Sequence, residues 1–215
     1  RSLIVGLGVQ GVKRLAISAK DTVATVDPIV ASADYKSIEQ VPIDSFDAAL
    51  VCTPDQAKLD ILSYLLLKGK HVLVEKPLLS LNENQLTQLR EGVQASGAAC
   101  YTAYNHRFEP HIVRLKKVLD EGILGEIYLA KLFYGNGTSM DVKRSSWRDQ
   151  GQGVLHDLGS HLVDLTLFLF GQPSGRFEIW AENQFETRSI DHVLFGSPGS
   201  PFLELEATYL SWKNT

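Results

Sequence analysis

Gly6-Leu-Gly8-Val-Gln-Gly11 follows the apolar run Leu3-Ile-Val5 near the start of the chain, and Asp27 ends the next apolar run, residues 23–26. In a strand–turn–helix unit, the first glycine permits a tight turn, the second lets the backbone approach a pyrophosphate, and the third lets helix and strand pack closely. The order of strand, glycine loop, helix, strand and acid therefore predicts a dinucleotide-binding site.

The acid that ends the second strand indicates which dinucleotide. A carboxylate at this position accepts hydrogen bonds from the ribose hydroxyls of NAD, whereas the phosphate of NADP favours an arginine. No arginine lies between Arg14 and Arg90, so we expect NAD rather than NADP. The residues of this segment that we expect to bind the cofactor are Gly6, Gly8, Val9, Gln10, Gly11 and Asp27.

The composition is that of an ordinary globular protein: 215 residues, 44% apolar and 21% charged. A net charge of -4 argues against nucleic acid or an anionic membrane as a partner. The longest apolar runs are too short or too interrupted to span a bilayer, and no signal-peptide pattern opens the chain. Cys52 and Cys100 lie in apolar runs, at a spacing not typical of a metal site. We expect a cytoplasmic protein with reduced core thiols and no metal.

Strands and helices alternate through the first hundred residues. This alternation predicts an α/β domain over residues 1–103, with a parallel, doubly wound sheet covered on both faces. Ser80 and Glu83 have the spacing of a capping box for a helix that runs to about Gly97. After Asp27, the expected elements of this domain are strands at 48–52, 71–74 and 98–104 and a helix through 59–66.

After Tyr104 the pattern changes to that of an α+β domain, residues 104–215, with a mostly antiparallel sheet. The last strand is expected to end almost at Thr215, which would leave this sheet incomplete at the C-terminus, by truncation or because a partner completes it. The expected elements are helices at 110–121 and 154–170, strands at 127–133, 176–182, 191–195 and 202–212, and a Gly-, Ser- and Arg/Lys-rich loop after residue 133.

Four charged or titratable side chains are candidates for chemistry. Lys76 follows a parallel strand at the carboxyl edge, where ligands bind in open α/β sheets; a solvated surface lysine is the alternative. In the helix at 154–170, Asp157, His161 and Asp164 share about one face. An imidazole is well suited to accept a proton near neutral pH, although an exposed helical Asp/His pair would look the same in sequence.

The chain resembles the Gfo/Idh/MocA oxidoreductases, which include glucose-fructose oxidoreductase and inositol dehydrogenase. The resemblance covers nearly the whole chain. It implies a Rossmann domain followed by a domain whose sheet binds substrate and often mediates homo-oligomer formation, as a dimer or tetramer. The motifs that carry it, in order, are the glycine loop, Thr53-Pro54, Glu75-Lys76-Pro77, Tyr104-Asn-His-Arg-Phe108, Leu124-Gly-Glu-Ile127 and Asp157-x-x-x-His161.

The resemblance also implies roles for matching residues. Lys76 would contact both the nicotinamide and the substrate hydroxyl, Asp157 would position the substrate, and His161 would accept the proton. Thr53, Pro54 and Glu75 would join the cofactor site. The implied reaction moves a hydride between NAD and a secondary hydroxyl of a sugar, nucleotide sugar or cyclitol. Reduction of a carbonyl or imine, and an NAD-binding regulatory module without catalysis, are the alternatives.

The sequence indicates the substrate contacts less clearly than the cofactor contacts. The loop at residues 141–149 offers basic groups to a carboxylate or diphosphate and a tryptophan ring to a sugar face, although a solvated loop with one packed ring would have the same sequence. Family members often carry Thr-Pro-Asn-x-x-His, whereas this chain has Thr53-Pro-Asp-Gln-Ala-Lys58, and it is shorter than a usual member, as expected of a fragment. The candidate substrate residues are Tyr104, Asn105, Arg107, Trp147 and Arg148, with His156 as a weaker candidate.

Overall fold

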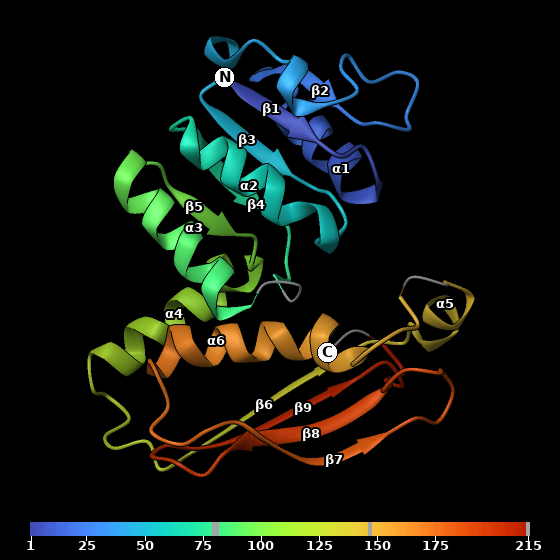
Figure 1. Cartoon of the computed structure of the whole chain (residues 1–215). Helices are drawn as coiled ribbons and strands as arrows, with labels where there is room; N and C mark the ends of the chain where they lie inside the picture. The colour runs from blue at the N-terminus through green and yellow to red at the C-terminus, as the bar shows by residue number, and fades with distance from the viewer. Residues whose placement is uncertain (79–81, 146–147, 214–215) are drawn as a thin grey trace. The chain divides into compact units, whose positions relative to one another are not determined.

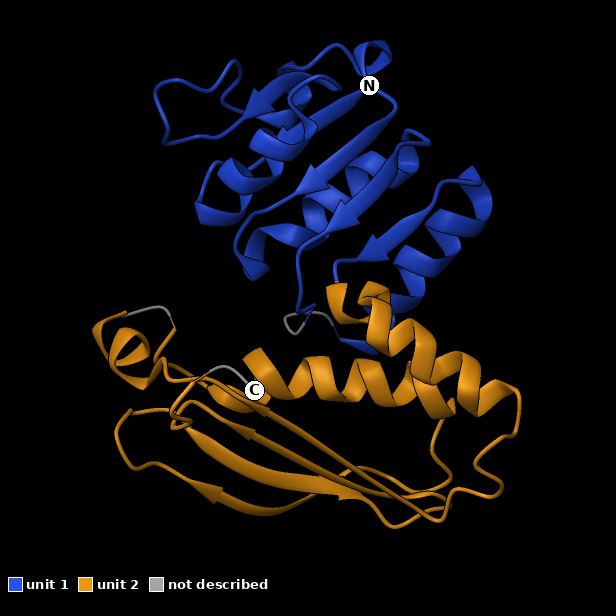
Figure 2. Ribbon diagram, turned by 180° about the vertical axis from the view of Figure 1, so that it is seen from behind, with its two compact units in different colours: residues 1–103 blue, residues 104–215 orange. Residues whose placement is uncertain are grey.

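The computed structural model describes residues 1–78, 82–145 and 148–213. The chain divides into two compact units, Arg1–Ala103 and Tyr104–Thr215 (Figure 2). The first unit contains the alternating strands and helices, and the second contains the later helices and strands. Each unit is described by itself below.

The first unit is a parallel five-stranded sheet in the order β2-β1-β3-β4-β5 (Figure 1). All four strand pairings are parallel, as the alternation of strands and helices predicted. Strand order reverses beside β1, so the loop after β1 lies at the switch point where such sheets bind ligands. The elements are β1 (Ser2–Val5), α1 (Val9–Ser18), β2 (Thr22–Val26), β3 (Ala48–Val51), α2 (Lys58–Leu67), β4 (His71–Val74), α3 (Glu83–Ser96) and β5 (Cys100–Thr102).

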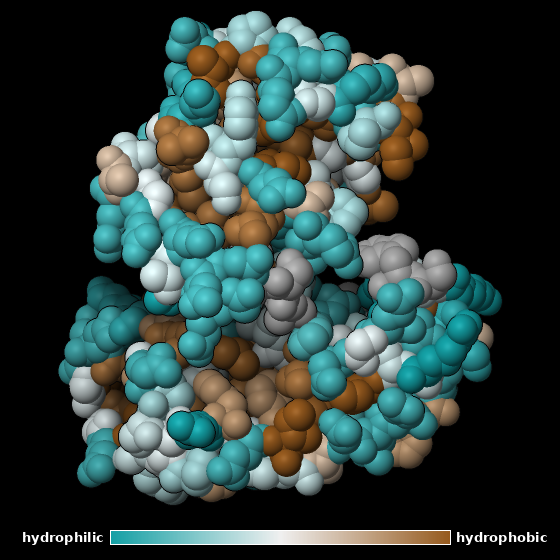
Figure 3. All heavy atoms as spheres, viewed as in Figure 1, coloured by the Kyte–Doolittle hydropathy of each residue, from teal (hydrophilic) through white to brown (hydrophobic). Residues whose placement is uncertain are grey.

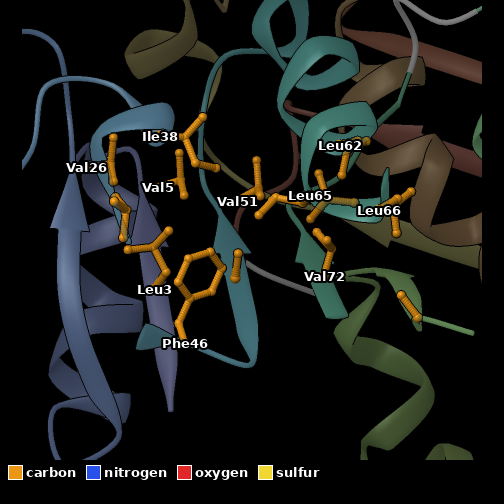
Figure 4. Close-up of a cluster of buried hydrophobic side chains, with 14 of the residues drawn as sticks. Leu3, Val5, Val26, Ile38, Phe46, Val51, Leu62, Leu65, Leu66 and Val72 are labelled. Carbon is orange, nitrogen blue, oxygen red and sulfur yellow. The ribbon is translucent and has the colours of Figure 1, made fainter. Parts of the chain in front are cut away.

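Helices cover both faces of this sheet. Leu3 and Val5 point into a core that α2 and α3 close, whereas Ile4, between them in β1, is fully buried on the opposite face, where α1 packs on β1 and β3. Figure 4 shows Leu62 and Leu65 of α2 directed toward the strands. Burial of strand side chains on both faces is characteristic of a parallel sheet in an α/β unit.

The start of α3 differs from its prediction. The helix begins at Glu83 with Asn82 as its N-cap, and the Asn82 side chain accepts a hydrogen bond from the Gln85 amide at 3.0 Å. Gln85 bonds back to the Asn82 amide, which completes a capping box. The predicted box of Ser80 and Glu83 is therefore wrong, because Asn and Gln two positions later form the same motif. Ser80 itself lies outside the described residues.

The second unit contains a four-stranded sheet in the order β6-β9-β8-β7. β8 pairs antiparallel with both of its neighbours, and β6 pairs parallel with β9, so the predicted mostly antiparallel sheet is confirmed. The elements are α4 (Pro110–Asp120), β6 (Leu129–Gly135), α5 (Ser139–Arg144), α6 (Ser160–Phe170), β7 (Glu178–Asn183), β8 (His192–Ser197) and β9 (Phe202–Thr208).

α6 lies along one face of this sheet (Figure 1). Leu158 and Leu162 pack there against Phe195 and Leu205, so alternate residues of β8 and β9 form the core. On the other face, Trp180 of β7 stacks on Phe202 of β9, with ring centroids 5.5 Å apart, and both side chains are exposed. Figure 3 shows hydrophobic residues among hydrophilic ones on the viewed surface of both units.

Two elements of the second unit depart from the sequence expectation. The segment predicted as a loop contains α5, which forms because Val142 is fully buried in the core. The last strand ends at Thr208 rather than Trp212. The predicted helix at 154–170 is present, but residues Leu155–Gly159 are π-helical before α6 continues.

In the described part of the chain, no helix combines the length and the apolar character that crossing a membrane requires. Cys52 and Cys100 are free and half-buried. Burial raises the pKa of both thiols, that of Cys52 to about 11, which keeps them protonated at neutral pH and makes them poor nucleophiles.

Candidate active site

The three glycines after β1 differ in how much space surrounds them. A Cβ on Gly11 would lie 1.8 Å from the carbonyl oxygen of Gly6, and a Cβ on Gly6, whose φ is +91°, would lie 2.8 Å from the carbonyl oxygen of Cys52. Both positions therefore need glycine for the turn and for helix packing. A Cβ on Gly8 would meet no described atom within 4 Å, which is the open approach that a pyrophosphate needs.

Polar groups at this loop fit a dinucleotide. Gly8 is the N-cap of α1 and supplies no side-chain cap, so the first amides of the helix face outward as anion donors. Thr53 follows β3 at the same sheet edge; among the described residues, none forms a hydrogen bond with its buried Oγ1. A buried hydroxyl in that state is suited to a ligand partner.

Asp27, directly after β2, is bound to the glycine loop. Its Oδ2 accepts the Leu7 amide at 2.8 Å, and its Oδ1 accepts the amides of Ile29 and Val30, each at 2.9 Å. Burial opposes ionisation of this carboxyl, which is 9% exposed, but the three amides outweigh burial and hold its pKa below the ordinary value. A carboxylate has about four acceptor positions, so Oδ2 retains capacity for a ribose hydroxyl.

The segment Glu75-Lys76-Pro77 follows β4 at the same carboxyl edge. Glu75 forms an ion pair with Arg14 of α1, with Nη2 and Oε1 2.7 Å apart. Lys58, the first residue of α2, donates to the carbonyl oxygens of Glu75 and Pro77 at 2.7 and 2.6 Å. Lys76 thus lies in a turn that both neighbouring helices hold.

In the second unit, His161 of α6 lies within a group of rings. It is 7% exposed, and the rings of Tyr104, His106 and Tyr134 meet it edge to face, with centroids 5.5, 4.6 and 5.9 Å away. His106 is also bonded through Nδ1 to the Glu109 carboxylate. Burial raises the pKa of Tyr104 and of Tyr134, so both phenols stay protonated at neutral pH.

Asp157 lies in the π-helical turn before α6, and two side chains contact its Oδ2. The hydroxyl of Tyr209 donates to its Oδ2 at 3.1 Å, and Nη2 of Arg148 lies 3.3 Å from the same atom. Burial, and then the charge of Asp157, raise the pKa of Tyr209 far above its ordinary value. Tyr209 is therefore a fixed donor that orients this carboxylate.

Asp164 lies three residues after His161 in α6, and its carboxylate is bound by an arginine of the same unit. Arg107 donates to it through two nitrogens, Nε to Oδ2 at 2.7 Å and Nη2 to Oδ1. The guanidinium also lies over the ring of Phe168, 5.5 Å from its centroid. Arg107, a candidate substrate residue, thus makes a bidentate ion pair that joins the short helix at 105–108 to α6.

The remaining candidates are less informative. Asn105 is exposed at the start of that short helix, His156 is half-buried in the π-helical turn, and Trp147 lies outside the described residues. The described residues contain no group of three His, Cys, Asp or Glu side chains arranged to hold a metal ion.

Comparison with known families agrees with this geometry. Residues 12–104 match the model of an oxidoreductase family with an NAD-binding Rossmann fold, and residues 112–196 match the model of the GFO/IDH/MocA C-terminal domain. The chain belongs to the Gfo/Idh/MocA family. The two matches follow the order of the two compact units along the chain.

Relatives within the Gfo/Idh/MocA family include two inositol enzymes. The chain is 31% identical over 140 residues to scyllo-inositol 2-dehydrogenase (NADP(+)) IolW of Bacillus subtilis, covering 63% of this chain and 38% of the relative. It is 28% identical over 153 residues to inositol 2-dehydrogenase of Rhizobium meliloti, covering 70% and 41%. The matches thus span about two fifths of each relative's length.

A solved structure has the same fold as this chain. The structure of an oxidoreductase from Agrobacterium radiobacter, in complex with NAD+, L-tartaric acid and magnesium, superposes with a TM-score of 0.85 at 15% identity. The match covers 100% of this chain and 68% of that one. At this identity, the likeness establishes the fold.

Sequence reasoning missed three residues of this Gfo/Idh/MocA chain. His106 lies inside a motif used for the resemblance, yet its place against His161 has no local signal. Lys58 stood out only as a departure from the usual histidine. Tyr209 lies in the predicted strand at 202–212, and nothing near it in sequence connects it to Asp157, 52 positions earlier.

Proposed function

We propose that the protein is an NAD-dependent dehydrogenase that oxidises a secondary hydroxyl of a sugar, nucleotide sugar or cyclitol. The observation that carries the proposal is the open approach at Gly8, beside the uncapped N-terminus of α1. Family membership and the buried imidazole of His161 support it. Both enzyme relatives described above carry names of inositol dehydrogenases.

NAD, when bound, supplies the acceptor of the hydride. Asp27 would bind the ribose, and Gly6, Gly8, Val9, Gln10 and Gly11 would hold the pyrophosphate with Thr53 and Pro54 nearby. The ammonium of Lys76 would lower the energy of the forming alkoxide. His161 would take the hydroxyl proton as general base, and Asp157, oriented by Tyr209 and Arg148, would position the substrate.

The choice of NAD over NADP rests on charge. The Asp27 carboxylate is ionised at neutral pH and would repel the additional phosphate of NADP. One relative carries NADP(+) in its name, so the choice is best tested directly. We expect the dissociation constant of NADH to be at least about tenfold smaller than that of NADPH, a difference of about 1.4 kcal/mol.

The surroundings of His161 and Asp157 support a polar, hydroxyl-bearing substrate. The rings of Tyr104 and Tyr134 lie against His161, and burial keeps both phenols protonated at neutral pH. Arg148 and Asp157 offer a donor and an acceptor, the pair of groups that polyols bind. Asn105 and Trp147 stay predictions as substrate contacts, as do the cytoplasmic location and a homo-oligomer.

The test is NADH formation measured by absorbance against sugars, uronates, nucleotide sugars and inositols. His161→Ala should remove turnover and leave NADH binding near that of the parent, because the imidazole serves the proton step. His192→Ala, in β8 of the same unit, is the matched control and should keep turnover. A parent that binds NADH and turns over no member of the panel would favour the regulatory alternative. Equal loss of binding and turnover in His161→Ala would make His161 structural.

A further inference from the structure

The turn that carries Lys76 is held from two helices. Arg14 of α1 bonds to the carboxylate of Glu75, and Lys58 of α2 bonds to the main chain on both sides of Lys76. We propose that Lys58 is a positioning residue that fixes the backbone of Lys76 and thereby sets turnover, while leaving cofactor affinity unchanged. The inference rests on the role proposed above for Lys76.

Lys58 is buried, and oxygen atoms surround its ammonium group. It is 2% exposed, and its Nζ contacts the carbonyl oxygens of Glu75 and Pro77 and lies 3.3 Å from Oδ1 of Asp55. Two of the three ammonium donors are thus used in hydrogen bonds to carbonyl oxygens, and Asp55 adds an ion pair. A buried charge persists only where such partners replace water.

Charges of both signs lie around Lys58 and act on its pKa. Burial lowers the pKa of Lys58, and the carboxylates of Asp55 and Glu75 oppose this change. Lys76 is near enough for its own charge to disfavour a second ammonium here. The two carbonyl bonds therefore hold Lys58 in place against repulsion from Lys76.

The bonds of Lys58 act on the main chain, and those of Arg14 act on a side chain. Lys58 donates to the carbonyl oxygens of the two residues that flank Lys76. The Glu75 carbonyl belongs to the peptide group that leads into Lys76, and the Pro77 carbonyl belongs to the peptide group after Pro77, so movement of either group breaks a hydrogen bond. Arg14 fixes only the carboxylate of Glu75. Lys58 thus controls where the Cα of Lys76 lies, and a shift of about 1 Å in a catalytic group costs up to about a hundredfold in rate.

The position also explains a departure from the family pattern. The chain has Asp55 and Lys58 where family members often carry Asn and His, and the structure pairs these two residues with each other. A neutral amide and an imidazole could not form this ion pair. The two departures from the family pattern therefore belong together, because Asp55 and Lys58 form one ion pair beside the turn that carries Lys76.

The test compares Lys58→Met, which removes the charge at nearly constant length, with Lys58→Arg, which keeps a cation. Lys68→Met is the matched control, because Lys68 is an exposed lysine at the end of the same helix. Three quantities are measured for the whole chain: NADH affinity by fluorescence, kcat on the substrate that the panel identifies, and the acylation rate of Lys76 by peptide mass spectrometry. Thermal unfolding confirms that each variant is folded.

We expect Lys58→Met to lower kcat by about tenfold to a hundredfold, to change the acylation rate of Lys76 at least about threefold, and to leave NADH affinity within about threefold. Lys58→Arg should recover part of kcat, and Lys68→Met should match the parent. Parent-like kcat and acylation in Lys58→Met would overturn the inference. So would equal loss of NADH affinity and kcat, which would make Lys58 a support for the cofactor site.

Two outcomes separate this inference from the proposed function. If no substrate is turned over, the acylation rate of Lys76 still decides whether Lys58 positions it. If Lys58→Met does not fold, Lys58→Arg decides, because a guanidinium keeps the charge but cannot reproduce the contacts of a compact ammonium. A parent-like acylation rate in Lys58→Arg would then overturn the inference.

Discussion

The imidazole rings of His106 and His161 meet edge to face in the second unit, with centroids 4.6 Å apart. One ring belongs to α6 and the other to the short helix at 105–108, so the contact joins two elements. Glu109 holds His106 by its Nδ1. The orientation of the proposed base therefore depends on a second histidine and, through it, on a carboxylate.

His106→Phe keeps a ring against His161 but removes the bond to Glu109. We expect turnover to fall by about tenfold, because a ring without its anchor no longer limits the orientation of His161, while NADH affinity stays that of the parent. Steady-state kinetics and NADH fluorescence measure the two quantities. Glu109→Gln should show a smaller loss in the same direction, and parent-like turnover in both variants would mean that the contact is only packing.

Gly8 and Gly11 provide a contrast within one loop. Gly8→Ala adds a methyl group where no described atom lies within 4 Å, so the chain should unfold at nearly the parent temperature while NADH binding weakens about tenfold or more. Gly11→Ala would place a Cβ 1.8 Å from the Gly6 carbonyl and should destabilise the fold by several kcal/mol. Calorimetry and NADH titration check both variants. Parent-like NADH affinity in Gly8→Ala would contradict the proposed site.

Tyr209→Phe removes the hydroxyl that orients Asp157. The expected cost is about 1 kcal/mol of stability for one hydrogen bond, together with a lower kcat/KM because the carboxylate gains freedom. Asp157→Ala is the partner in a double-mutant cycle. The two losses should be strongly non-additive, since both variants remove the same contact; simple additivity would show that Tyr209 acts elsewhere.

Asp27 should make stability depend on pH in the acid range. Its folded pKa lies below the ordinary value of 3.8, so its contribution is present above that value and is lost as the pH falls through the lower folded value. Asp27→Asn should be less stable than the parent by about 1–3 kcal/mol at neutral pH. The difference should shrink at a pH below 3.8. Urea unfolding at both pH values measures it, and a constant difference would refute the ionic role.

The elements of the first unit could be predicted from the sequence, because each is indicated by residues only a few positions apart. The spacing of Gly6, Gly8 and Gly11 indicates a strand–turn–helix unit, and apolar runs that alternate with helical periodicity indicate a parallel sheet. The cap of α3 was misplaced, because Asn82 with Gln85 and Ser80 with Glu83 have the same spacing. α5 was missed since Val142 is its one buried apolar residue, and its other buried residue, Ser139, is polar.

By itself, then, the sequence determined the fold class, with its parallel and mostly antiparallel sheets, and the family. Only the tertiary structure brought Tyr209 to Asp157, His106 to His161 and Lys58 to the carbonyls around Lys76. The physical reason is sequence separation. Turns and helices are encoded by neighbours a few residues apart, whereas these contacts depend on how packed helices and strands return the chain to one place, and no short-range pattern records that path.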